Sequence, residues 1–153
     1  MQTITPFLWF NDNAEAAANF YCSVFKTSKL GRVSRQGPGG AVMVVAFELD
    51  GQEFIALNGG PMYKFTEAVS FVVHCDTQQD VDHYWTSLTA DGGAESRCGW
   101  LKDKFGLSWQ IVPRILSKLM SDPAPAKSAR VMQAMLKMNK LDIAGLQQAY
   151  DQG

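Results

Sequence analysis

The amino-acid sequence predicts an α+β fold built from two βαβββ modules and a C-terminal helical tail. The same order of apolar strand, helix and turn-separated strands occurs twice along the chain. The two helices also share one apolar pattern at a constant offset of 64 residues. The first helix has this pattern, spaced i, i+3, i+4 and i+7, at Ala17, Phe20, Tyr21 and Val24. The second helix repeats it at Val81, Tyr84, Trp85 and Leu88. A matched pair of buried faces favours an internal duplication.

Module one is expected over residues 1–62. Its first strand, 4–10, is followed by Asn11-Asp12-Asn13, which is typical of a helix N-terminus. Asp50-Gly51 is a strong signal for a two-residue β-hairpin, and Gly59-Gly60-Pro61 ends the last strand. The remaining elements expected here are a helix over 14–25 and strands over 28–35, 41–49 and 53–58.

Module two is expected over residues 66–114. Asp76-Thr77 with Asp80 resembles a capping box, and Gly92-Gly93 ends the helix that follows. Pro113 closes the module. The expected elements are a helix over 77–91 and strands over 68–75, 94–98, 100–102 and 107–112.

The helical tail is expected over residues 115–153. Helices are predicted over 115–120, 127–138 and 141–150, the last of them capped by Asp142. The methionine-rich tail has two interpretations: it packs on its own chain, or it clamps a partner subunit. We expect modules and tail together to form one domain over 1–153.

Composition excludes several classes of partner. The formal net charge is -1, so no basic field is present to attract nucleic acid. No apolar run reaches the length that spans a membrane, and the N-terminus lacks the features of a signal peptide. Three widely spaced cysteines favour free thiols over a disulfide framework. These observations predict a cytoplasmic protein.

A specific string of residues carries a family resemblance. It runs from Trp100 to Pro113, reads WLKDKFGLSWQIVP, and follows Cys98-Gly99. Together with Phe20-Tyr21, Asp50-Gly51, the segment 58–61 and the tail segment 138–150, it resembles the PhnB-like branch of the glyoxalase/bleomycin-resistance/dioxygenase (vicinal oxygen chelate) superfamily. Members of this branch are often labelled 3-demethylubiquinone-9 3-methyltransferase. The resemblance implies that each module curls its sheet into a half-barrel around a shared cavity, with the helices outside.

The resemblance also implies where metal ligands would stand. Metal-dependent members carry them on the first and last strands of each module, positions that fall on Thr5, Ala56, Ser70 and Gln110. A methyl group and neutral hydroxyl and amide groups cannot replace the imidazole, carboxylate or thiolate donors of zinc, nickel or iron sites. His83 lies on a helix, and module one has no histidine. We therefore expect no catalytic metal and no cofactor.

Strand alternation then predicts the residues that line the cavity. They are Thr5, Phe7, Trp9, Phe54, Asn58, Ser70, His74, Ser108 and Gln110. Core packing is the alternative for the aromatic residues, and a structural hydrogen bond is the alternative for Asn58 and Gln110.

Three further positions are weighed for chemistry. His74 is interpreted as a strand-end histidine bonded to backbone, with acid–base catalysis as the alternative. Cys98 is interpreted as a structural thiol, because no histidine partner is evident. The segment 102–104, Lys-Asp-Lys, is interpreted as a solvated turn, or as an attraction for an acidic ligand.

The resulting functional hypothesis is a metal-free homodimer that binds a small apolar or aromatic metabolite. The alternative is an enzyme of the same superfamily. Methyl transfer ranks last, because enzymes that bind S-adenosylmethionine in a doubly wound sheet use a glycine-rich loop between a strand and a helix. Here Gly37-Pro-Gly-Gly40 and Gly59-Gly60 lie between strands.

Overall fold

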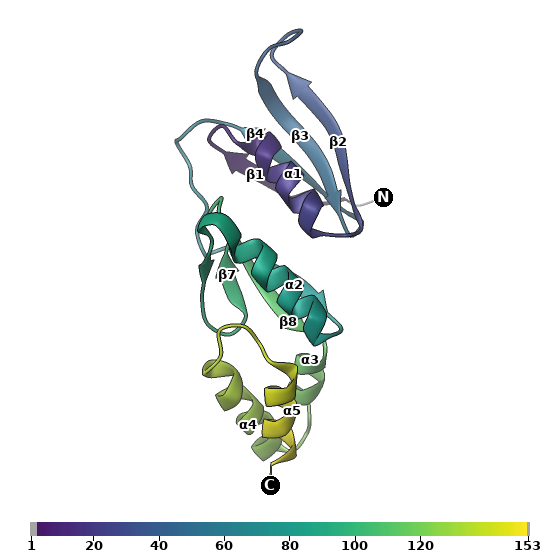
Figure 1. Cartoon of the computed structure of the whole chain (residues 1–153), viewed down its shortest axis with the longest axis vertical. Coiled ribbons are helices and arrows are strands. Elements are labelled where there is room, and N and C mark those ends of the chain that lie inside the picture. The colour runs from purple at the N-terminus through teal and green to yellow at the C-terminus, as the bar shows by residue number, and fades with distance from the viewer. Residues whose placement is uncertain (1–2, 153) are drawn as a thin grey trace. The chain divides into compact units, whose positions relative to one another are not determined.

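The computed structural model describes residues 3–152 (Figure 1). The chain divides into two compact units, the first ending at Phe65 and the second beginning at Thr66. Each unit contains one sheet with a helix packed across it. No helix among residues 3–152 is both long and apolar enough to cross a membrane.

The first unit is a four-stranded mixed sheet with one helix. Its strands run in the order β1-β4-β3-β2, and β1 lies parallel to β4. Asp50 and Gly51 both have positive φ, as the predicted hairpin between β3 and β4 requires. The elements are β1 (Phe7–Phe10), α1 (Ala14–Val24), β2 (Ser28–Arg35), β3 (Val42–Leu49) and β4 (Gln52–Asn58).

The second unit repeats this arrangement in its sheet. The strand order is β5-β8-β7-β6, with β5 parallel to β8, so each strand takes the place of its counterpart in the first unit. The identical order confirms the predicted α+β fold of two βαβββ modules. The elements are β5 (Ser70–Cys75), α2 (Gln78–Thr89), a single 3-10 turn (Ala90–Gly92), β6 (Ala94–Glu95), β7 (Trp100–Lys102) and β8 (Ser108–Pro113).

The matched helix faces are buried as the duplication requires. Ala17, Tyr21 and Val24 of α1 are buried against the first sheet, and the other member of the pattern, Phe20, is half-buried. Their counterparts on α2 show the same order of burial: buried Val81, half-buried Tyr84, and buried Trp85 and Leu88. The offset therefore holds for accessibility as well as for residue type.

The ends of several elements differ from the prediction. β6 stops at Glu95 because the chain turns at Cys98 and Gly99, whose φ angles are 59° and 84°. Pro113 is the last residue of β8 rather than a break after it. Thr77 caps α2 as predicted, accepting a hydrogen bond of 3.1 Å from the Asp80 amide.

The tail forms three helices that belong to the second unit. They are α3 (Ile115–Met120), α4 (Pro125–Leu136) and α5 (Ile143–Asp151). α4 starts two residues earlier than predicted because proline is well suited to the first turn of a helix. Leu119, Val131, Leu141 and Leu146 are buried together between the three helices, which gather beside one another in Figure 1.

Gln78 fastens this tail to α2. Its Nε2 donates to the Leu141 carbonyl at 3.1 Å, and its Oε1 accepts from the Ile143 amide at 2.8 Å. The Cys98 and Gly99 amides also donate to the carbonyls of Met138 and Asn139, each at 2.8 Å. The tail is therefore packed on its own chain, whatever else it contacts.

Candidate functional site

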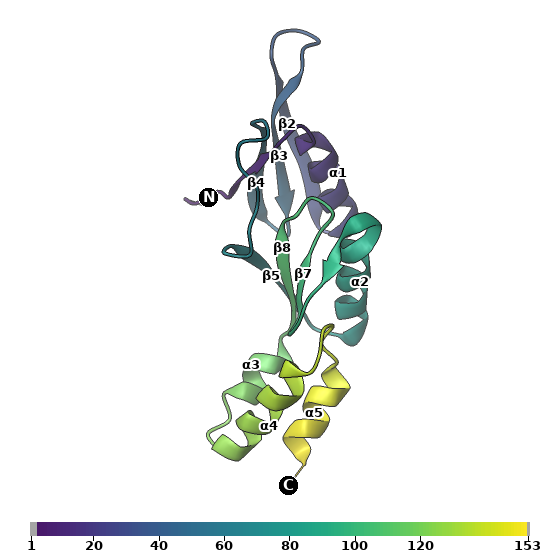
Figure 2. The same cartoon turned by 90° about the vertical axis from the view of Figure 1, so that its left-hand side faces the viewer.

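Each sheet is covered by a helix on one face only. Figure 2 shows α1 and α2 each lying against a single side of their sheet. We call the side turned away from the helix the open face of that sheet. Because directly paired residues of adjacent strands point to the same side, the strand registers assign every side chain to one of the two faces.

In the first unit the predicted site residues divide between the two faces. β1 pairs with β4 so that Phe7 lies opposite Ile55 and Leu8 lies opposite Ala56. Leu8 and Ala56 are buried, whereas Phe7 is 57% exposed. Phe7 and Trp9 are thus on the open face, on the side that the alternation also assigns to half-buried Thr5 just before β1. The β4 residues with them are Ile55 and Leu57.

Phe54, Ala56 and Asn58 lie on the opposite, helix-covered face, which corrects the sequence-based assignment. The Phe54 ring stacks on Phe47 with centroids 5.3 Å apart, and Phe47 in turn stacks on Tyr21 of α1. Alternation alone assigned all of these to one side because it gives the spacing within a strand but not the register between strands. Phe54 is a core residue of the first unit.

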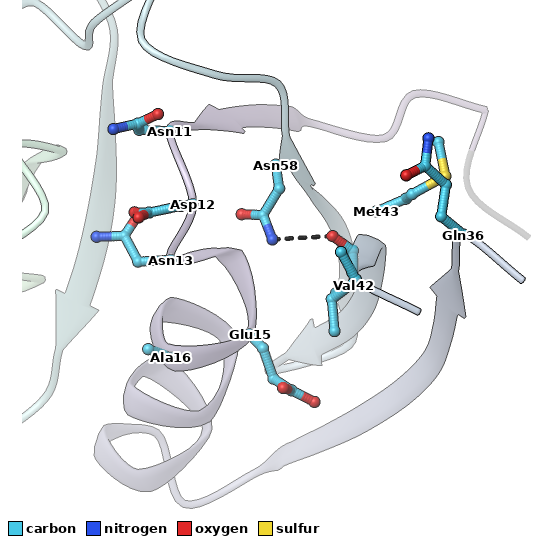
Figure 3. A pocket seen from close by; sticks show the side chains of 10 residues that line it. Asn11, Asp12, Asn13, Glu15, Ala16, Gln36, Val42, Met43 and Asn58 are labelled. Atoms are coloured by element: carbon cyan, nitrogen blue, oxygen red, sulfur yellow. Dashed lines mark hydrogen bonds between the residues drawn. The ribbon is translucent and has the colours of Figure 1, made fainter. Parts of the chain in front are cut away.

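Asn58 holds the N-terminus of α1. Its Oδ1 accepts from the Ala14 amide at 2.8 Å. Its Nδ2 donates to the Val42 carbonyl at 3.1 Å, the bond drawn in Figure 3. Asn13, at the N-cap position, makes no side-chain capping bond, so Asn58 of β4 supplies an acceptor that the helix would otherwise lack. The structural hydrogen bond weighed for Asn58 is the one observed.

A pocket of about 710 Å³ opens at this helix end (Figure 3). Polar side chains around it include Asn11, Asp12 and Gln36, with Met43 on the strand side. Asn58 is the one predicted site residue that lines it, and its amide is engaged on both sides. The pocket therefore holds none of the open-face residues.

Trp9 packs on the chain that leaves β4. Its indole Nε1 donates to the Gly60 carbonyl at 2.9 Å, and its ring meets Tyr63 edge to face at 4.9 Å. Gly59 lies against the indole with no room for a side chain. Trp9 therefore holds the 59–63 segment, a role that alternation alone does not reveal.

In the second unit the predicted residues come together on one face. The register pairs Ser70 with Ser108, Val72 with Gln110 and His74 with Val112. β7 extends the first two rows, because Lys102 lies opposite Ser108 and Trp100 lies opposite Gln110. On the open face of this sheet the paired side chains therefore form three rows that run across the strands: a polar row, a mixed row and a short third row. In order they are Ser70–Ser108–Lys102, Val72–Gln110–Trp100 and His74–Val112.

Gln110 and Ser70 are joined directly on this face. The Gln110 Nε2 donates to the Ser70 Oγ at 3.0 Å. Among residues 3–152 this is the hydrogen bond that the Gln110 side chain makes, so its Oε1 can still accept a hydrogen bond and its second N–H can still donate one. Val72 beside it is 44% exposed, and Trp100 and Val112 are half-buried. The arrangement presents an amide and a hydroxyl between apolar walls.

Trp100 was not predicted to line a site, and Lys102 was considered only as part of the 102–104 segment, as an attraction for an acidic ligand, and not as a residue of this face. They belong to a strand of three residues that had no alternation long enough to interpret. Their pairing with β8 is the signal that assigns them, and it follows from the tight turn at 103–106. Lys102 also forms an ion pair with Glu67.

The segment 102–104 is not simply a solvated turn. Asp103 is 2% exposed and accepts three hydrogen bonds, from the amides of Phe105 and Leu107 and from the Trp109 indole. His74, by contrast, is exposed at the other end of the face. Burial raises the pKa of the Cys75 thiol to about 12, which makes Cys75 a protonated core residue at neutral pH.

The residues at the four positions implied for a metal do not suit one. Ser70 and Gln110 offer neutral oxygens, and the β4 side chains that share the open face with Thr5 are aliphatic. No group of three or more histidine, cysteine or acidic side chains within residues 3–152 is placed to hold a metal ion. The donor chemistry of these positions therefore differs from that of zinc, nickel or iron centres.

Comparison with known proteins gives one family and several structural relatives. The model of the family described as 3-demethylubiquinone-9 3-methyltransferase matches residues 2–112. The match ends before the helical tail. A search of curated proteins gave no match.

The PhnB protein of Bacillus cereus, which carries the same methyltransferase description, is 35% identical to this chain. The match covers 73% of this chain and 99% of that protein, with a TM-score of 0.67. The fosfomycin resistance protein FosX of Listeria monocytogenes is 14% identical, with 77% and 97% of the two chains covered and a TM-score of 0.55. A glyoxalase/bleomycin resistance protein of Albidiferax ferrireducens is 15% identical over 74% and 99%, with a TM-score of 0.51. The last two share the fold.

Proposed function

We propose that this chain, which belongs to the 3-demethylubiquinone-9 3-methyltransferase family in its PhnB-like, glyoxalase-related form, binds a small organic molecule. The proposed site is the open face of the second sheet, and binding there needs no metal ion. Gln110 and Ser70 contact a polar group of the ligand. Trp100, Val72 and Val112 contact its apolar or aromatic part.

The observation that carries this proposal is the half-buried Gln110 amide among apolar side chains. A face whose only role was packing would gain little from a glutamine with unused hydrogen-bonding capacity. Ligand sites, by contrast, typically combine apolar walls with a few placed polar groups. Ser70 fixes the orientation of the amide through the 3.0 Å bond to its Nε2. The Oε1 is then left to accept from a ligand.

Metal-free binding is supported by donor chemistry. The four positions where the superfamily places metal ligands carry neutral or aliphatic groups in this chain, and those groups do not polarise or deprotonate as metal ligands do. The family's methyltransferase label has little support from the fold. Both helices α1 and α2 start after polar turns without glycine, and the Gly-rich segments join strands.

An enzyme is the second candidate, favoured by His74. This side chain is exposed on the same face, one row beyond Gln110, and imidazole is the side chain best suited to exchange protons near neutral pH. His74→Gln separates the candidates, because it keeps binding in the first and removes turnover in the second.

We also propose a cytoplasmic homodimer. The free cysteines Cys22, Cys75 and Cys98 suit a reducing compartment. Exposed apolar side chains on the open faces, Phe7 and Val72 among them, favour cover by a second copy. Light scattering at micromolar concentration is expected to give twice the chain mass, and a stable monomer would contradict the dimer.

The binding proposal is tested with 2-naphthamide, a flat neutral probe with one amide, by calorimetry. Gln110→Ala is expected to weaken binding roughly three- to tenfold, the effect of one neutral hydrogen bond of about 0.5–1.5 kcal/mol. Gln133→Ala, at an exposed position on α4, is the matched control and should bind as the wild type does. Equal affinity of the Gln110→Ala variant and the control, with the fold intact, would contradict the proposal.

A further inference from the structure

One residue of the polar row on the second open face, Lys102, forms an ion pair that affects which ligand the face can bind. The row runs across three strands, with Ser70 on β5, Ser108 on β8 and Lys102 on β7. The Lys102 Nζ is paired with the carboxylate of Glu67, three residues before β5. The pair therefore lies at the β7 end of the row, with Ser108 between Lys102 and the Ser70 that Gln110 contacts.

Both partners of the pair reach solvent. The side chain of Lys102 is 43% exposed and that of Glu67 is 64% exposed. Exposed pairs of this kind contribute little to stability, because water screens the charges and two long side chains lose freedom. A carboxylate from solution can therefore replace that of Glu67 at small cost.

The hydrogen bond from Lys102 lowers the pKa of Glu67 below its ordinary value. Glu67 is thus an anion at neutral pH, in contact with the cation that a ligand anion would need. Its position imitates that of a ligand's carboxylate.

Resting on the proposed function, we infer that this face selects a flat organic acid, whose carboxylate displaces Glu67 from Lys102 while its ring lies along Trp100, Val72 and Val112. Ser70 and Gln110 contribute donors beside the carboxylate. Lys102 is then the residue that determines specificity, and Glu67 is a built-in competitor that limits affinity for the acid.

The test compares 2-naphthoate with 2-naphthamide, which share a ring and differ in charge, by calorimetry on the full chain. Glu67→Gln is expected to tighten binding of naphthoate roughly three- to tenfold and to leave naphthamide within about twofold, since the acid no longer has to displace a carboxylate from its charge-assisted contact with Lys102 and the amide makes no such contact. Lys102→Met is expected to abolish any preference for the acid over the amide.

Matched controls separate local contact from net charge. Glu95→Gln and Lys104→Met change the charge of the chain by the same amounts at exposed positions outside the row, and should leave the ratio of the two affinities unchanged. Equal ratios in the Glu67→Gln and Lys102→Met variants and their controls would overturn the inference. If naphthamide binding still depends on Gln110 in that case, the proposed function stands alone; if the wild type binds neither probe, both are overturned.

Discussion

The carboxylate of Asp103 organises the turn that aligns β7 with β8. Its Oδ1 accepts from the Phe105 amide at 2.8 Å and the Leu107 amide at 3.1 Å, and its Oδ2 accepts from the Trp109 indole at 2.8 Å. These three N–H donors supply hydrogen bonds to both oxygens of the buried carboxylate. Because Trp109 lies between Ser108 and Gln110, this turn also fixes the site residues in register.

Asp103→Asn is expected to lower the free energy of unfolding by about 1–3 kcal/mol, because an NH₂ group must then face one of the three N–H donors. Urea unfolding monitored by circular dichroism measures this loss. Asp12→Asn, at an exposed position of the first unit, is the control and should change stability by less than about 0.5 kcal/mol. An equally small effect at Asp103 would contradict the role given to the turn.

The contact between Gly59 and Trp9 gives a second prediction at this scale. A Cβ added to Gly59 would lie 2.7 Å from the Trp9 Cδ2, closer than carbon atoms approach. Gly59→Ala is therefore expected to destabilise the chain by about 1–3 kcal/mol through overpacking. In a Trp9→Ala background most of that cost should vanish, as a double-mutant cycle of thermal or urea unfolding would show. Additive effects of the two changes would assign the cost to the backbone instead.

Which residues share a face of their sheet was predictable in the second unit and not in the first. Ser70, His74, Ser108 and Gln110 lie on one face because the alternation of β5 and of β8 happens to match their register. Phe54 and Asn58 do not share a face with Trp9, because β1 pairs with β4 one residue out of the assumed phase. Register depends on contacts between segments far apart in sequence.

At the scale of elements, the tail depends on Gln78. The side-chain amide of Gln78 bonds the carbonyl of Leu141 and the amide of Ile143. Leu141 is fully buried. Gln78→Ala leaves the carbonyl of Leu141 and the amide of Ile143, two partly buried groups, without their partner, at a cost of at most about 1–3 kcal/mol each. Hydrogen exchange of α5 amides is expected to accelerate, and Gln79→Ala, exposed one residue along, should not change it. Unchanged protection in the Gln78 variant would contradict the anchoring.

The same junction predicts acid sensitivity. The hydrogen bond from Lys140, with a second from Gln78, lowers the pKa of Asp82 below its ordinary value of 3.8. A lowered pKa in the folded state adds stability that is present above the ordinary value and is lost as the pH falls through the folded value. Tail amides should therefore exchange faster, relative to their intrinsic rates, below about pH 4. Asp82→Asn should remove that pH dependence, and persistence of it would assign the effect to another carboxylate such as Asp122.

For the whole molecule, the fold was predictable because the order of strand, helix and three further strands occurs twice in the sequence. The apolar pattern of α1, at Ala17, Tyr21 and Val24, recurs in α2 at a fixed distance along the sequence, and local periodicity is enough to detect it. In the structure the corresponding residues of both helices are buried. The two sheets also have the same strand order, β1-β4-β3-β2 and β5-β8-β7-β6. The end of β6 and the start of α4 were less predictable, because a turn at Cys98 and a proline at the helix start decide them.

NMR chemical-shift mapping of the labelled chain, titrated with 2-naphthamide, locates the ligand site directly. Saturable shifts are expected only in amides of β5, β7 and β8 and in the side-chain amide of Gln110, and the side-chain amide of Asn58 at the α1 pocket should not shift. Shifts centred on that pocket, or on the tail, would contradict the assignment of the ligand site to the open face of the second sheet.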